Sequence, residues 1–252
     1  MDEINLQKLS VNDPRAPKPK RGNLWQRLNR RAQRFMVSKR KLSTRNLDRL
    51  CRDFATDKRT LVVHSEDVDH TPYFPNAYTV TKRPDVPADM HVDLYYRDLS
   101  QIESDSYEVV LCSGLLEHVP DPQRLIDELH RIVKPGGKVI ISASAVFSFH
   151  ECPDNFFHFT PYGMKLLLKD FSQIEMVRGA SQPFETIGIL LQRILLQCDI
   201  LPPVRPLIEA MAWSMRLFDY TVIRQYDTRH MRDERTLTDS MLPSNIQAAA
   251  VK

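Results

Sequence analysis

Apolar residues between positions 107 and 142 follow a strand–helix–strand pattern. Val109, Val110 and Leu111 form a short continuous apolar run, which is typical of a strand buried on both faces of a sheet. Apolar residues then recur at helical spacing and predict a helix with one apolar face; they are Leu125, Ile126, Leu129, Ile132 and Val133. A second buried strand is expected over residues 138–142. The pattern predicts one unit of a parallel sheet with a right-handed crossover.

Both ends of this central helix carry sequence signals. Asp121 can cap its first turn, and Pro122 can occupy the first helical position, where a missing N–H costs nothing. Lys134-Pro135-Gly136-Gly137 places a cation and then glycines at the other end, which favours termination of the helix.

Further elements are expected on both sides of this unit. Predicted strands cover residues 60–64, 77–81, 91–94, 174–177 and 246–251, and predicted helices cover 44–55, 160–171, 185–197 and 207–220. The connections between the first three strands are short and rich in proline, so this half of the sheet is expected to be irregular. The apolar stripe from Ile187 to Leu195 is interpreted as core or as a homodimer interface, with a lipid site as the less favoured alternative.

Charge is distributed unevenly along the chain. The net charge is +3, yet residues 15–52 carry fourteen Lys or Arg and one acid, so the remainder is acidic. We expect a disordered Pro/Lys-rich tail over residues 1–22, a basic helical segment over 23–58, and one main domain over 59–252 with a helical insertion at about 185–225.

The basic segment allows three interpretations. Leu24, Trp25, Leu28 and Phe35 can line one side of a basic amphipathic helix that reaches about residue 40. Such a helix could be a solvated cap on the domain, or residues 24–40 could make peripheral contact with an anionic membrane surface. A nucleic-acid arm is disfavoured, because aromatic residues are sparse and the rest of the chain is acidic.

Composition excludes some classes of protein. The four cysteines lie far apart without paired-ligand spacing, so reduced thiols are expected and no metal site is predicted. There is no run of 18 apolar residues, and the polar N-terminus lacks the apolar region of a signal peptide. We expect a cytoplasmic protein, either free or peripheral to the inner membrane face.

Two stretches resemble a known family. Leu116-Glu117-His118-Val119, together with the KPGG segment, resembles class I S-adenosylmethionine-dependent methyltransferases. Residues 150–163, HECPDNFFHFTPYG, resemble a narrower, type 11-like branch often met among enzymes that modify bacterial glycans and related metabolites. The resemblance implies an α/β, Rossmann-like, doubly wound fold. Its seven-stranded sheet would be mostly parallel with a reversed last strand, here flanked by N-terminal basic helices and a C-terminal helical insertion.

The resemblance implies S-adenosyl-L-methionine as cofactor, bound at the carboxyl ends of the strands. Asp93 matches the acid that usually meets the adenine edge, and Asp98 is a second candidate, because the spacing to Tyr107 is longer than usual. The implied contacts follow the first, third and fourth strands: His64, Ser65, Asp93, Leu94, Ser113, Gly114 and Leu115. Ser113 and Gly114 can equally be a tight strand exit.

The first loop departs from the family pattern. Family members carry an acid and two or three glycines directly after the first strand, whereas this chain has no glycine between Gly22 and Gly114. Side chains in residues 64–70 would obstruct close backbone approach, and three carboxylates there would repel the cofactor's carboxylate. The acid that usually binds the ribose after the second strand is also missing, and Thr81-Lys82-Arg83 stands in its place.

The resemblance also implies residues for catalysis and substrate binding. His118 and His150 are the candidate bases. Alternatively, His118 is a hydrogen-bonded turn residue without a catalytic role, and His150 serves only to pack its loop. The implied substrate contacts are Glu117, Glu151, Phe156, Phe157 and His158. The Phe156–Phe159 aromatics can form a substrate wall or anchor the loop in the core.

Two functions remain open. The first is methyl transfer to oxygen or nitrogen of a small molecule or glycan. The second is a degenerate relative that has lost cofactor binding and serves as a scaffold or partner-binding subunit.

Overall fold

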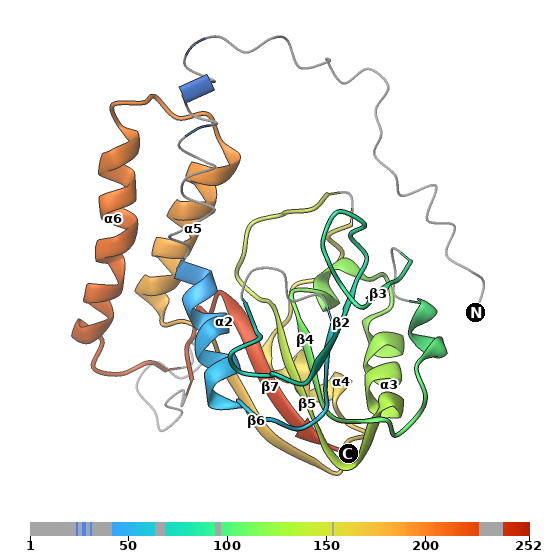
Figure 1. Cartoon of the computed structure of the whole chain (residues 1–252). Coiled ribbons are helices and arrows are strands. Elements are labelled where there is room, and N and C mark those ends of the chain that lie inside the picture. Colours follow the sequence, from blue (N-terminus) through green and yellow to red (C-terminus); the bar gives the residue numbers. More distant parts are fainter. Residues whose placement is uncertain are drawn as a thin grey trace.

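The structure, a computed structural model, describes residues 42–63, 69–93, 97–152, 154–226 and 239–252, together with Leu24, Arg27, Leu28 and Arg31. Within this part of the chain, seven strands form one sheet in the order β3-β2-β1-β4-β5-β7-β6 (Figure 1). Their bounds are β1 Thr60–Val63, β2 Ala77–Thr81, β3 Met90–His91, β4 Tyr107–Ser113, β5 Val133–Ser144, β6 Gln173–Gly179 and β7 Asn245–Val251.

The strand directions confirm the predicted fold class. The pairs β1–β2, β1–β4, β2–β3 and β4–β5 are parallel. The last strand, β7, is antiparallel to both β5 and β6 and lies between them. The sheet is therefore mostly parallel with one reversed strand, and that strand enters the sheet one position in from the edge.

Helices cover both faces of the sheet (Figure 1). The helices are α2 Leu42–Asp53, α3 Pro122–Ile132, α4 Pro161–Leu167, α5 Pro183–Gln197 and α6 Arg205–Phe218, with short 3-10 turns η2 Arg97–Gln101, η3 Leu116–His118 and η4 Asp219–Thr221. The larger core cluster joins Leu61, Val110 and Ile141 to the apolar sides of α3 and α4. On the other face, Leu50 and Cys51 of α2 join Leu111 in a second cluster. Alternate strand residues thus supply opposite faces, as the pleat requires.

The predicted start of α3 is confirmed, whereas the predicted end of the helix at the KPGG segment is wrong. Asp121 accepts a hydrogen bond from the Arg124 N–H at 3.1 Å, and Pro122 opens the helix. The helix ends at Ile132, and the KPGG residues lie inside β5 rather than in a turn before it. A register shift between Tyr107 and Val109 accommodates them, and Gly136 has φ +74°, a conformation that glycine adopts at little cost.

The first half of the sheet is irregular, as predicted. Among the described residues, turns rather than helices connect β1 to β2 and β2 to β3. The Asp89 carboxylate accepts hydrogen bonds from the Thr79 N–H and hydroxyl, each at 2.7 Å, and so closes the β2–β3 connection. The strand β3 is shorter than expected and begins one residue earlier.

The α5–α6 hairpin corrects the interpretation of the apolar stripe. Ile187 and Ile194 are 37% and 46% exposed, so the core interpretation is wrong for both. The buried face of α5 instead carries Gly188 and Leu195, with Thr186, Ile189 and Gln192. This face is buried because α6 approaches closely at Gly188, where a Cβ would overlap the carbonyl oxygen of Ala212. The homodimer interface stays a prediction.

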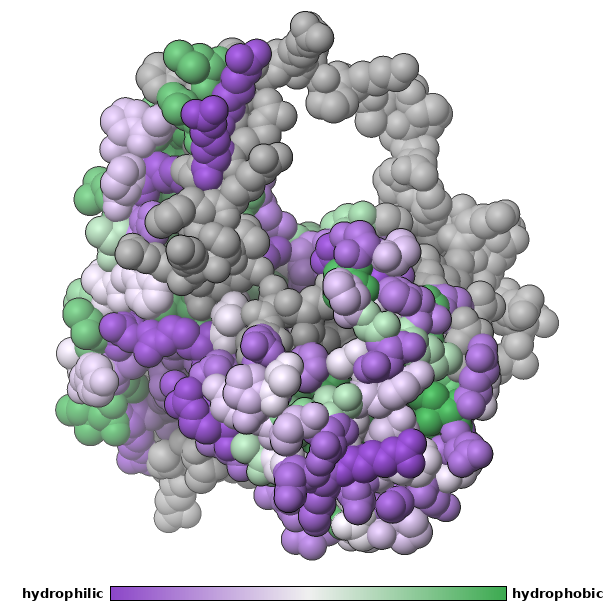
Figure 2. Space-filling model, viewed as in Figure 1, coloured by the Kyte–Doolittle hydropathy of each residue, from purple (hydrophilic) through white to green (hydrophobic). Residues whose placement is uncertain are grey.

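The outer side of the hairpin is partly apolar. Figure 2 shows apolar residues interspersed with polar ones over α5 and α6 at its left edge. Exposed large apolar side chains of this region include Leu201, Leu207, Met211, Leu217 and Tyr220.

Little of the basic N-terminal segment is described. Leu24 and Leu28 are helical and are 67% and 40% exposed, whereas the tail at 1–22 and most of 23–41 lie outside the described residues. Across the described ranges, we find no helix with both the length and the apolar character needed to cross a membrane.

We expect Gly188→Ala to destabilise the protein by about 1–3 kcal/mol, because the added methyl group collides with backbone at a tight helix contact. Gly163→Ala in α4 is the matched control: its methyl group would meet only the Thr160 hydroxyl oxygen, at 3.3 Å, and Ala favours helix. Urea denaturation measures both. Equal effects of the two substitutions would contradict a close α5–α6 contact.

Candidate functional site

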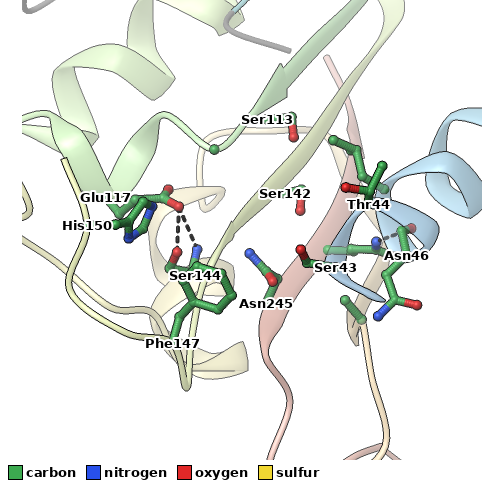
Figure 3. Close-up of a pocket in the computed structure, with 14 residues that line it drawn as sticks. Ser43, Thr44, Asn46, Ser113, Glu117, Ser142, Ser144, Phe147, His150 and Asn245 are labelled. Atoms are coloured by element: carbon green, nitrogen blue, oxygen red, sulfur yellow. Dashed lines mark hydrogen bonds between the residues drawn. The ribbon is translucent and has the colours of Figure 1, made fainter. Parts of the chain in front are cut away.

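Polar side chains gather at the carboxyl ends of β4 and β5. Ser113 ends β4, and Ser142 and Ser144 end β5. Because β7 is antiparallel, its first residue, Asn245, pairs with Ser144 at the same edge. These residues line a cavity of about 80 Å³ (Figure 3). The start of α2 closes one side with Ser43 and Thr44.

Glu117 is a buried carboxylic acid in the wall of this cavity. It lies in η3, directly after β4, and is 1% exposed. Its Oε1 accepts hydrogen bonds from the Ser144 hydroxyl at 2.6 Å and the Ser144 N–H at 3.2 Å. Its Oε2 is buried and has no hydrogen-bond partner among the described residues. Burial raises the pKa of Glu117, and the bonds from Ser144 act in the opposite direction.

His118 and His150 meet beside Glu117. The Nε2 atoms of the two rings are 3.2 Å apart. His118 Nδ1 is 2.5 Å from the carbonyl oxygen of Asp154, and His150 Nδ1 is 2.9 Å from that of Ser148. Since a carbonyl oxygen only accepts, both Nδ1 atoms carry the proton. Burial lowers the pKa of both imidazoles, which favours their neutral forms.

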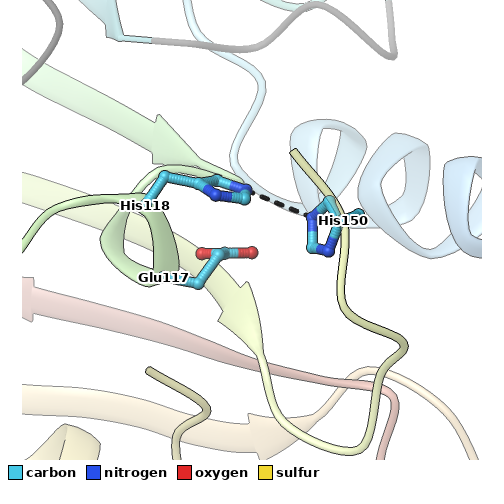
Figure 4. A group of neighbouring side chains, drawn as sticks. All are labelled: Glu117, His118 and His150. Carbon is cyan, nitrogen blue, oxygen red and sulfur yellow. Dashed lines mark hydrogen bonds between the residues drawn. The ribbon is translucent and has the colours of Figure 1, made fainter. Parts of the chain in front are cut away.

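The three side chains form one compact cluster (Figure 4). One donor atom from each of Glu117, His118 and His150 lies within 4.8 Å of the other two. The backbone supports this arrangement, because the Phe156 N–H donates to the Glu117 carbonyl oxygen at 2.8 Å. We call these three residues the Glu–His–His cluster.

Helix α5 fixes the loop that carries His150. Arg193 of α5 donates from Nε to the Ser148 hydroxyl at 2.8 Å and lies over the Phe147 ring at 4.9 Å. Gln197 donates to the Phe149 carbonyl oxygen at 2.6 Å. The cluster therefore depends on contacts between segments more than 40 residues apart.

The predicted cofactor residues are placed as follows. Ser113 and Gly114 line the cavity; Gly114 has φ +64°, and its N–H donates to the Ser142 carbonyl oxygen at 2.8 Å. Leu115 is fully buried in the core, so its side chain does not face the cavity. Asp93 follows β3 and is half-buried. His64, Ser65 and Leu94 lie outside the described residues.

The predicted catalytic and substrate residues separate into two groups. Glu117 and His150 line the cavity, and His118 lies behind them. Away from it, Glu151, Phe157 and His158 are exposed, and Glu151 pairs with Lys82 at 3.3 Å. Phe156 is half-buried, and Phe159 belongs to the core cluster.

Sequence reasoning missed several lining residues. Ser142 and Ser144 carry a signal that could have been used, since they end a predicted buried strand at the edge where ligands bind. Asn245 and Phe147 carry no such signal. The reversed strand and the packing of α5 bring them to the cavity.

Comparisons with known proteins agree with this architecture. A family model described as a methyltransferase domain matches residues 67–141. The ubiquinone biosynthesis O-methyltransferase of Pseudomonas syringae pv. tomato is 49% identical over 45 residues, which are 18% of this chain and 19% of that protein. The Coxiella burnetii enzyme of the same name is 36% identical over 55 residues, or 21% and 24% of the two chains. The matches thus span about a fifth of these curated relatives.

The solved structure of a SAM-dependent methyltransferase from Archaeoglobus fulgidus has a similar fold over most of this chain. Its TM-score is 0.52 at 14% identity, and the match covers 84% of this chain and 93% of that one. At this identity the likeness concerns the fold.

We expect Ser144→Ala to lower the free energy of unfolding by about 1–3 kcal/mol, because Glu117 loses a buried hydroxyl donor. Ser142→Ala is the control, since it removes a hydroxyl from the same cavity without touching Glu117. In a Glu117→Ala background the cost of Ser144→Ala should largely disappear. Urea denaturation of the four proteins in this cycle measures the coupling between the two residues. If Ser144→Ala costs as much stability in the Glu117→Ala background as in the wild type, the hydrogen bond between Ser144 and Glu117 does not contribute to stability.

Proposed function

We propose that the chain is a class I S-adenosylmethionine-dependent methyltransferase, since it has the fold of these enzymes and residues 67–141 match a methyltransferase domain. We propose further that it methylates an oxygen or nitrogen atom of a small molecule or glycan. The observation that carries the proposal is the polar cavity at the carboxyl ends of β4 and β5, with Glu117 and His150 in its wall. In open α/β sheets, ligands bind outside the carboxyl ends of the strands.

The described residues fit the proposed cofactor on one side of the crevice. S-adenosylmethionine supplies, when bound, an electrophilic methyl group on sulfur. The end of β4 offers Ser113 and the backbone of Gly114, whose positive φ brings the chain close without a Cβ. Asp93, at the end of β3 on the same edge, provides a carboxylate for a hydrogen-bonding edge such as that of adenine.

The lining of the cavity favours a polar acceptor. Hydroxyls of Ser113, Ser142 and Ser144 and the amide of Asn245 surround it. A site built from hydrogen-bonding groups rejects an apolar group, because its buried polar atoms would then be unpaired. This supports a hydroxyl- or amine-bearing acceptor, such as a small metabolite or a sugar residue.

The Glu–His–His cluster is the proposed activating group. Glu117 and His150 line the cavity. Both Nδ1 atoms are held by carbonyl oxygens, so the Nε2 atom of each neutral ring carries the lone pair. A positioned group that helps an acceptor lose its proton is what methyl transfer to oxygen requires. We also propose that the exposed residues Glu151, Phe157 and His158 contact the acceptor outside the cavity.

Cofactor binding is the first test of this proposal. We expect the purified protein to bind S-adenosylhomocysteine with micromolar affinity in calorimetry, and Asp93→Ala to weaken that affinity by about tenfold or more, since a lost hydrogen bond of about 1.4 kcal/mol corresponds to tenfold. Asp85→Ala is the control, because Asp85 is exposed and pairs with Arg83 in a turn. No binding at millimolar concentration would favour a degenerate scaffold.

A second proposal concerns residues 24–40, for which we infer peripheral contact with an anionic membrane surface. Leu24 and Leu28 are exposed, and Arg27 and Arg31 stand one helical turn apart. We expect co-sedimentation with phosphatidylcholine vesicles only when they contain phosphatidylserine, and loss of it in high salt. Reversing both arginines to Glu should abolish it; binding that ignores charge and salt would contradict the proposal.

A further inference from the structure

The two histidines of the Glu–His–His cluster face each other through atoms that cannot hydrogen-bond as neutral groups. Each Nδ1 donates its proton to a backbone carbonyl oxygen, so each neutral ring presents a lone pair at Nε2. These two lone-pair atoms are 3.2 Å apart. Such an arrangement is repulsive unless a positively charged species lies against both nitrogens.

The geometry of the pair matches two ligands of one metal ion. Two nitrogens at about 2.0–2.1 Å from a tetrahedral zinc ion are about 3.3 Å apart, close to the observed 3.2 Å. The ring centroids are only 4.7 Å apart and the planes are nearly perpendicular, at 84°. Since head-on rings with this nitrogen–nitrogen distance would hold their centroids farther apart, the two rings meet at an angle (Figure 4).

The surroundings of both rings are those of metal ligands. A histidine that binds a metal typically donates its other ring N–H to a carboxylate or a backbone carbonyl, which fixes the tautomer and the orientation of the ring. His118 and His150 both do so, through Asp154 and Ser148.

Glu117 supplies the negative charge and a third ligand. Its Oε1 is held by Ser144, whereas its Oε2 is buried without a partner among the described residues. A buried, unpartnered carboxylate oxygen is costly, and a cation removes that cost. Glu117 and His150 also line the cavity, which leaves a fourth position open to a small molecule.

We propose that Glu117, His118 and His150 form a binding site for a first-row divalent cation, with zinc as the best match to two imidazoles and a carboxylate. Its role rests on the proposed function. An acceptor hydroxyl bound at the open position would release its proton to water more readily, and the oxygen left behind is the nucleophile. In the loaded site the imidazoles act as ligands, and the cation lowers the pKa of the acceptor.

Metal binding to the chelator-stripped full-length protein tests the site. We expect one Zn²⁺ per chain to bind in calorimetry with micromolar or tighter affinity, and Co²⁺ to give the visible absorption of a tetrahedral ion. His150→Gln should weaken zinc by at least about 100-fold, and His118→Gln and Glu117→Gln should also weaken it. His130→Gln is the control, because His130 packs on Phe171 at the other end of α3.

Several outcomes would overturn the site. The proposal fails if the wild-type protein and the folded His150→Gln variant bind zinc with equal affinity. A cobalt spectrum with thiolate charge transfer would assign the ion to exposed Cys152 or Cys198. The imidazole ¹⁵N chemical shifts give a further test. The proposal also fails if these shifts show one proton shared between the two Nε2 atoms of the metal-free protein and do not change when zinc is added.

The result separates from the test of the proposed function. Calorimetry with S-adenosylhomocysteine probes the cofactor half of the crevice through Asp93, whereas zinc calorimetry probes the cluster. Cofactor binding without zinc binding would remove the metal site and leave the methyltransferase proposal. Zinc binding without cofactor binding would support the metal site and contradict the methyltransferase proposal.

Discussion

A buried hydrogen bond between the Glu117 carboxylate and the Ser144 hydroxyl joins the ends of the two central strands. Glu117 follows β4 and Ser144 ends β5, so the bond fixes the two segments that form the floor of the cavity. A carboxylate that is 1% exposed needs such a partner, because an unpaired buried charge is costly. The position of η3, and with it the backbone of His118, follows from this constraint.

The sheet explains why the polar groups meet at this edge. Parallel strands end at the same side, which brings Ser113, Ser142 and Ser144 together. The reversed strand β7 begins there instead of ending there and contributes Asn245. Since β7 lies between β5 and β6, its polar start is next to the cavity and away from the outer edge of the sheet.

The helices outside the central unit serve the site by holding loops. Arg193 and Gln197 of α5 bind the backbone and side chains of residues 147–149, directly before His150. Gln192 of the same helix accepts the Leu42 N–H at 2.8 Å and so fixes the start of α2, which closes the cavity. The tight contact at Gly188 with α6 sets the rotation of α5. The α5–α6 hairpin is therefore part of the support of the site, and its exposed outer face is a separate feature.

The sequence by itself determined the elements whose causes are local. The caps at Asp121 and Thr160 each bond a backbone N–H three residues away, and the buried runs of β4 and β5 show in the order of apolar residues. The family motifs pointed to Glu117, His118 and His150 as functional candidates, but no spacing rule joined them. Only tertiary structure brought His118 within 3.2 Å of a residue 32 positions later, and Glu117 to Ser144, 27 positions later. The tertiary structure also decided which face of α5 is buried. Helical spacing shows that apolar residues share one side of a helix, but it cannot show which side a neighbouring helix approaches.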